Sequence, residues 1–214
     1  MRAVGLLIGL VLFLLSSCTP SLFKGMEKQG KEVAYRQDLF PLFDGCDSAL
    51  VLNAVIDYKS NSFSGLLVVA PSDSVTGAYR LAFTSYFGMT VFDFEVGEKI
   101  FVVHHCMEQL ERKAVLSIFE RDFRALLMLD VPLKFKATRY AKDNEVGYKL
   151  KTTAGKSFYR TDVSRKRWTA TDMPGMLTAL EIRLMELPSQ EFPKIEMNHP
   201  KLGLRIGMEK LQEE

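Results

Sequence analysis

Apolar and polar residues alternate along most of the chain after residue 49. In the segment LVLNAVIDY (50–58), every second residue from Leu50 to Tyr58 falls on one face. This period of two is that of a half-buried β-strand. Gly, Asn, Asp and Ser separate successive runs at short intervals, which is typical of an antiparallel meander. The pattern predicts strands over 50–58, 62–70, 77–83, 88–96, 98–106, 133–141, 146–153, 156–164, 167–172, 176–187, 193–198 and 202–211.

The period changes to three and four residues in the segment 107–129. Leu110, Ala114 and Ile118 and then Phe119 and Phe123 recur at that spacing, which predicts one or two amphipathic helices before Pro132. The segment 31–43 is a candidate for a short helix interrupted by Pro41. The segment 176–187 has helix-forming residues, but its apolar residues alternate, so we expect a strand there.

Together these elements predict a mainly β (α+β) fold. A sheet of about eleven antiparallel strands tends to curl. We therefore expect a half-barrel with helices laid into its concave side, an architecture that can hold an apolar cavity. The candidate residues that line this cavity are Tyr79, Leu81, Phe83, Phe92, Phe94, Leu180, Ile182 and Leu184.

The segment TSYFGMT (84–90) lies between two predicted strands and should form a tight hairpin. Gly88 supplies the positive φ that such a turn needs. The tip then carries Tyr86 and Phe87, although hairpin tips usually carry polar residues. An exposed aromatic tip indicates contact with a partner or a membrane. The alternative is that both rings fold back onto the edge of the sheet.

The first eighteen residues have the layout of a bacterial signal peptide. Arg2 precedes an apolar run, and the run ends in Leu15-Ser16-Ser17-Cys18, which resembles a lipobox. A single membrane-spanning anchor is the alternative, but the run is short for one. We expect a signal peptide over 1–17, a lipidated Cys18 with a tether over 18–30, and a single domain over 31–214. We expect the body to lie in the cell envelope, held to a membrane only by this lipid.

The charge balance and the cysteines bear on two further questions, nucleic-acid binding and disulfide formation. The chain has 28 basic and 26 acidic side chains, so nothing suggests attraction to nucleic acid. If Cys18 carries lipid, Cys46 and Cys106 remain. They either pair in an oxidising periplasm or stay as two buried thiols, which is the favoured interpretation.

The residues offer no arrangement suited to catalysis or metal binding. His104 and Cys106 would share a strand face, but two ligands do not make a zinc site. We expect a strand end with one buried and one exposed histidine. Asp93 and Glu95 share a strand face and are expected on a solvated side. The prediction is a non-enzyme without cofactor or metal.

Three segments resemble the LolB family of outer-membrane lipoprotein receptors. YRLAFTSYFGMTVFDFEV (79–96) is similar to that family's third and fourth strands, and FSGLLVV (63–69) to the strand before them. FPKIEMNHPKLGLRIGMEKL (192–211) resembles the family's Pro-containing strand and glycine-led final strand. The lipobox and the short tether match as well.

The resemblance implies the half-barrel shared with the soluble carrier LolA. It implies a protein lipid-anchored in the outer membrane and facing the periplasm, which receives lipoproteins from a LolA-like periplasmic carrier and places them in that membrane. The candidate cavity would then hold their acyl chains. We expect a monomer. Phe87 matches the family's membrane-inserting leucine, whereas Tyr86 stands where the family often has Pro. The alternatives are a lipid-binding lipoprotein without a carrier partner and a structural lipoprotein whose sheet is packed shut.

Overall fold

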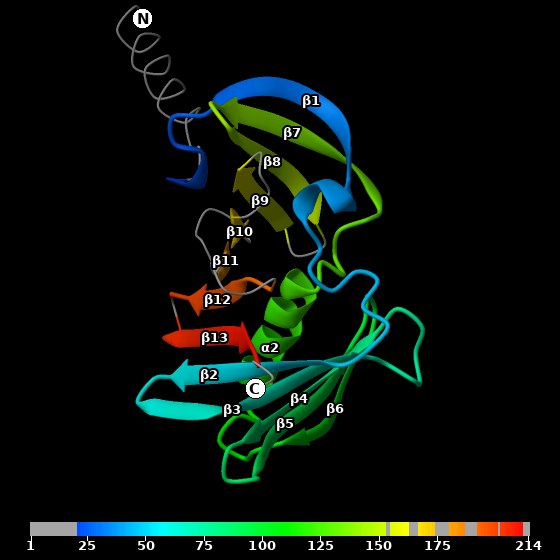
Figure 1. Cartoon of the computed structure of the whole chain (residues 1–214), viewed down its shortest axis with the longest axis vertical. Coiled ribbons are helices and arrows are strands. Elements are labelled where there is room, and N and C mark those ends of the chain that lie inside the picture. Colours follow the sequence, from blue (N-terminus) through cyan, green and yellow to red (C-terminus); the bar gives the residue numbers. More distant parts are fainter. Residues whose placement is uncertain are drawn as a thin grey trace, which may run out of the picture.

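The computed structural model describes residues 21–152, 155–162, 167–173, 180–186, 192–200 and 202–211. In these ranges the chain forms one antiparallel sheet of thirteen strands, one α-helix and two short 3-10 helices (Figure 1). The helices are η1 (Ser21–Phe23), η2 (Arg36–Leu39) and α2 (Lys113–Leu126). The strands are β1 (Glu27–Tyr35), β2 (Leu50–Tyr58), β3 (Asn61–Pro71), β4 (Tyr79–Ser85), β5 (Thr90–Val96), β6 (Phe101–Cys106), β7 (Lys134–Lys142), β8 (Glu145–Thr152), β9 (Gly155–Asp162), β10 (Arg167–Met173), β11 (Leu180–Met185), β12 (Lys194–His199) and β13 (Leu204–Lys210).

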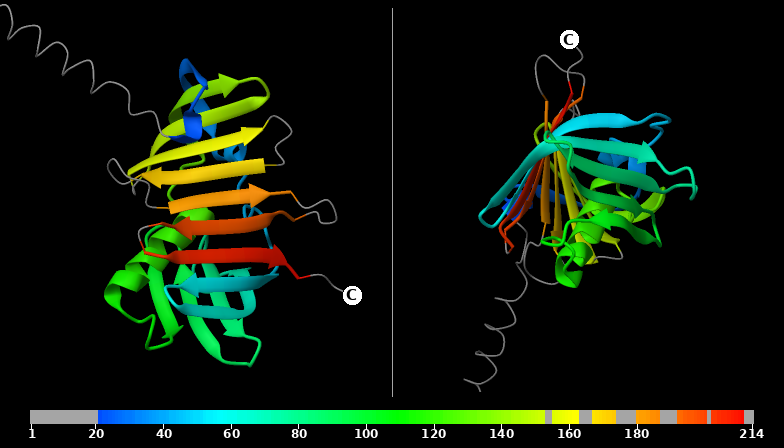
Figure 2. Two further views of the ribbon diagram at one scale, coloured as in Figure 1. Left: turned by 90° about the vertical axis from the view of Figure 1, so that its left-hand side faces the viewer. Right: turned by 90° about the horizontal axis from the view of Figure 1, so that it is seen from below.

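The strand order explains the place of the helix. The sheet runs β1-β7-β8-β9-β10-β11-β12-β13-β2-β3-β4-β5-β6, so β6 lies at one edge and β7 next to the other. The connection from β6 to β7 must therefore cross the sheet, and it does so through α2 on the concave side (Figures 1 and 2). The last strand, β13, pairs with β2 and joins the two halves of the sheet. The result is a curled, unclosed sheet, as the sequence predicts.

Alternation decides which side chains form the core. In β4, Leu81 and Phe83 are fully buried on the inner face, whereas Arg80 is exposed on the outer face. The rings of Phe92 and Phe94 in β5 stack at 4.6 Å, and Phe119 of α2 packs on both. Each fully buried phenylalanine stabilises the fold by about 1.5–3 kcal/mol.

Most of the predicted elements are confirmed. They include the strand at Leu180–Met185, whose residues would favour a helix by propensity alone. The sheet has thirteen strands where about eleven were expected. The helical segment is the single helix α2, shorter than the predicted range 107–129.

The structure differs from expectation between residues 21 and 43. Residues 27–30, expected in a flexible tether, belong to β1, and Phe23 is buried. Residues 31–35, expected in a helix, continue β1, and only the short η2 follows them. β1 is stabilised by pairing with β7, about a hundred residues away, so the residues near β1 in the sequence give little indication of it.

In the described ranges, no helix is long and apolar enough to cross a bilayer.

Candidate functional site

The hairpin between β4 and β5 has the predicted tight turn. Gly88 has φ +80° and donates its N–H to the carbonyl of Ser85 at 2.9 Å. Ser85 in turn donates its own N–H to the carbonyl of Met89 at 2.9 Å. The turn projects Phe87 away from the sheet, and its side chain is 97% exposed.

The two aromatic residues of the tip differ in their contacts. The Tyr86 hydroxyl donates to Oδ1 of Asn53 at 3.0 Å, so this ring leans over the outer face of β2. Phe87 has no such support, and Met89 beside it is about half exposed. The fold-back alternative therefore describes Tyr86 but not Phe87. The apolar tip consists of Phe87 and Met89.

The candidate lining residues for acyl chains all come together on the inner face. They belong to one apolar cluster, in which Tyr79 is half-buried and the other seven are buried. The Tyr79 hydroxyl donates to the carbonyl of Phe43 at 2.9 Å, and burial raises the pKa of Tyr79. In this conformation the phenylalanine rings fill the space under α2.

Helix α2 covers this cluster and is fixed by ring packing against β5 and by hydrogen bonds to His199 of β12 and to Ile100, just before β6. Phe123 packs against Phe92 with ring centroids 5.7 Å apart. Nη2 of Arg121 donates to Nε2 of His199 at 2.5 Å, so His199 presents a neutral ring nitrogen there. Nη2 of Arg124 donates to the carbonyl of Ile100 at 3.2 Å. A ligand among the inner-face rings would have to displace α2.

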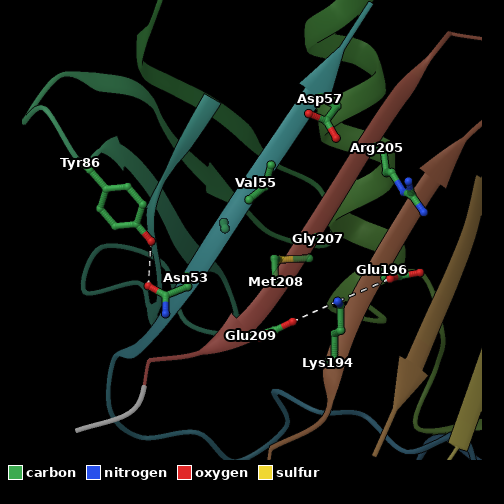
Figure 3. Close-up of a pocket in the computed structure, with 11 residues that line it drawn as sticks. Asn53, Val55, Asp57, Tyr86, Lys194, Glu196, Arg205, Gly207, Met208 and Glu209 are labelled. Atoms are coloured by element: carbon green, nitrogen blue, oxygen red, sulfur yellow. Dashed lines mark hydrogen bonds and ion pairs between the residues drawn. The ribbon is translucent and has the colours of Figure 1, made fainter. Parts of the chain in front are cut away.

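A separate cavity of about 410 Å³ lies on the outer face of the sheet, across β2, β13 and β12 (Figure 3). Gly207 leaves room in its floor, and Tyr86 stands at its rim. Lys194 bridges Glu209 at 3.0 Å and Glu196 at 3.8 Å along one side. This charged lining does not suit acyl chains. Sequence reasoning missed the cavity because it depends on the register of strands far apart in the chain.

The paired carboxylates of β5 are both engaged. Nε and Nη2 of Arg80 each donate a hydrogen bond to one carboxylate oxygen of Asp93, and this pairing lowers the pKa of Asp93. Glu95 is buried, contrary to the expected solvated position, and accepts hydrogen bonds from the hydroxyls of Ser72 and Ser74. These two bonds are the main reason that the pKa of Glu95 is lowered.

His104 completes this cluster, but the geometry is not that of a catalytic triad. Its Nε2 lies 3.2 Å from Oε2 of Glu95, while both serine hydroxyls donate to the carboxylate rather than to the ring. β6 is an edge strand in which residues 102–105 are all exposed, His104 and His105 among them, so the expectation of one buried histidine is wrong.

Metal and thiol chemistry find little support in the described ranges. They contain no group of three or more His, Cys, Asp or Glu side chains placed to hold a metal ion. Cys46 and Cys106 are free and half-buried. Burial raises the pKa of Cys106 to about 11, so this thiol stays protonated and poorly nucleophilic at neutral pH.

The N-terminal segment holds a contact that sequence reasoning missed. Phe23 of η1 packs on the outer face between Tyr140 and Phe158, with ring centroids 4.5 and 5.6 Å away. A Cβ on Gly147 would lie 2.6 Å from the Phe23 ring, so the absence of a side chain at Gly147 gives this ring the space that it occupies. A glycine inside an alternating strand is the signal that could have indicated it. Cys18 and the predicted signal peptide over 1–17 lie outside the described residues.

Comparisons with known proteins leave the function open. No protein-family model and no curated protein matches the sequence. A LolA superfamily protein from Nitrosomonas europaea has a TM-score of 0.39 at 11% identity, over 85% of this chain and 95% of that chain. A DUF1329 family protein from Desulfovibrio piger has a TM-score of 0.37 at 10% identity, over 78% of this chain and 85% of that chain. Likeness this distant carries no argument about function.

Proposed function

We propose that this protein is a lipid-anchored envelope protein that receives lipoproteins from a soluble periplasmic carrier and inserts them into the outer membrane. The observation that carries the proposal is Phe87, 97% exposed on a tight hairpin that projects from an apolar half-barrel. Polar residues are usual at a hairpin tip, whereas this tip exposes both Phe87 and Met89, which suits contact with the apolar side of a membrane interface.

The energetics suit passive transfer. Each acyl methylene buried from water contributes about 0.8 kcal/mol, so a cavity that binds acyl chains less tightly than a bilayer releases them without nucleotide hydrolysis. Phe87 contributes about 1.5–3 kcal/mol when fully inserted. That is too little to hold the protein on a membrane, so an anchor at Cys18 is part of the proposal. The hairpin then orients a body that the lipid already holds.

In this proposal acyl chains bind on the inner face after α2 moves aside. A photoactivatable fatty-acyl probe added to the purified full chain tests this step. We expect saturable crosslinking to inner-face residues such as Phe83, Phe92 and Ile182. Val55, on the outer face, is the matched negative position. Crosslinks confined to the outer face, or none at all, would contradict acyl binding in the half-barrel.

The filled core favours one other candidate, a structural lipoprotein whose sheet stays closed. Failure of the probe to bind would support it. A lipid-binding protein without a carrier partner would bind the probe yet give no crosslink to a soluble carrier. Depletion of the protein separates the proposed function from both, because only loss of an insertion step should leave other lipoproteins in the periplasm.

A further inference from the structure

One half of the outer sheet face carries a concentration of lysines. In β7, Phe135 and Ala137 are buried toward the core, so Lys134 and Lys136 point outward and are exposed. Cross-strand register extends this outward set into β1, β8 and β9. We call it the lysine face: Lys31, Lys134, Lys136, Lys149, Lys151 and Lys156.

The lysine face is not neutralised within the described part of the chain. None of its six lysines forms an ion pair there, and Lys151 lies directly opposite Lys156. The nearby Glu145 is engaged by Arg160. Like charges placed opposite each other in a sheet repel, and an unpaired basic surface attracts anions.

Exposed apolar residues adjoin the lysines. Val33 and Tyr35 of β1 lie opposite Lys136 and Lys134 and are 50% and 52% exposed. Leu133, just before β7, is 69% exposed. Aromatic, aliphatic and lysine side chains in one patch are typical of surfaces that lie at the headgroup level of a bilayer.

The described chain also begins on this face. η1 lies over the outer side of β8 and β9 (Figure 2, left), with Phe23 fixed against Tyr140 and Phe158. Three residue steps separate Cys18 from Ser21 and span at most about 11 Å. If Cys18 carries the anchor, as the proposed function requires, the lysine face cannot be far from the membrane.

We propose that the lysine face rests on a bilayer surface that contains anionic lipid headgroups. Each lysine near such a surface strengthens the association by about fivefold. The contact goes beyond cargo delivery, because it gives the body a second contact with the membrane besides the hairpin, near the opposite edge of the sheet, whether or not cargo is bound. The charge of the lysine face and the exposed apolar residues beside it do not depend on the proposed function. Only the argument from the anchor at Cys18 rests on the proposed function.

Amine labelling tests the contact. The purified full chain is reconstituted on vesicles with and without about one third phosphatidylglycerol and treated with a water-soluble amine reagent. Labelling is read residue by residue by mass spectrometry. We expect Lys134, Lys136 and Lys151 to be labelled at least about fivefold more slowly on the anionic vesicles. Lys99, Lys113 and Lys210 are exposed on other parts of the molecule and should react equally on both.

A charge-reversal variant sharpens the test. In K134E/K136E/K151E the protection of Lys31 and Lys156 should disappear, whereas the matched variant K99E/K113E/K210E should keep it. Equal labelling on the two kinds of vesicle would overturn the proposal, as would protection that survives 0.5 M salt. Protection by a soluble polyanion but not by vesicles would also overturn it. Labelling needs no cargo, so a failure of lipoprotein delivery would leave this result unchanged.

Discussion

Phe87 and Phe92 lie five residues apart and have opposite surroundings. Phe92 is fully buried among four other phenylalanine rings, whereas Phe87 is 97% exposed. A buried ring contributes to the stability of the fold, and an exposed ring contributes nothing to it. The packing of the folded domain therefore gives no reason for an aromatic ring at position 87, and the proposed membrane contact would supply one. Three predictions address this hairpin and the two strands that it joins, beginning with the largest effect.

Phe92→Ala should lower the free energy of unfolding by about 3–5 kcal/mol, because it leaves a cavity among packed rings. Phe87→Ala is the matched control and should change it by less than about 0.5 kcal/mol. Urea denaturation of both variants measures the difference. Similar losses in the two variants would mean that Phe87 packs in the core in solution.

Gly88→Ala should cost about 1 kcal/mol, because alanine is strained at φ +80°. Gly207→Ala is the control, since that glycine has ordinary strand geometry and open space where a Cβ would lie. The midpoint of urea unfolding reports both changes. A neutral Gly88→Ala would show that the turn adopts another geometry, and the projection of Phe87 would then need a different explanation.

Acid should lower the free energy of unfolding by a smaller amount, through two carboxylates of β5. The pKa values of Asp93 and Glu95 are lowered in the folded state, from ordinary values of 3.8 and 4.5. Their stabilising effect is therefore present at neutral pH and is lost as pH falls below those ordinary values. Asp93→Asn should flatten the dependence of unfolding free energy on pH between about 5 and 2, as measured by urea denaturation across that range. An unchanged slope in Asp93→Asn would contradict the assignment.

Local patterns in the sequence predict much of this molecule. The alternation of Leu81 and Phe83 with Arg80, and the glycine at position 88, are read directly from neighbouring residues. β1 escapes such a reading because Val33 and Ala34 are placed by pairing with β7. The lysine face left a visible trace in the segments KFK (134–136) and KLK (149–151). That these two segments share one surface follows only from the register of β7 and β8.

The most direct test of the proposed function is the rate at which cargo lipoprotein passes from a soluble carrier into liposomes. Phe87→Glu should leave folding and acyl-probe binding unchanged and slow delivery by roughly tenfold or more, since it replaces about 1.5–3 kcal/mol of apolar insertion with a charge. Phe87→Leu, which keeps an apolar tip, should deliver at nearly the normal rate. Normal delivery by Phe87→Glu would contradict the membrane role of the hairpin.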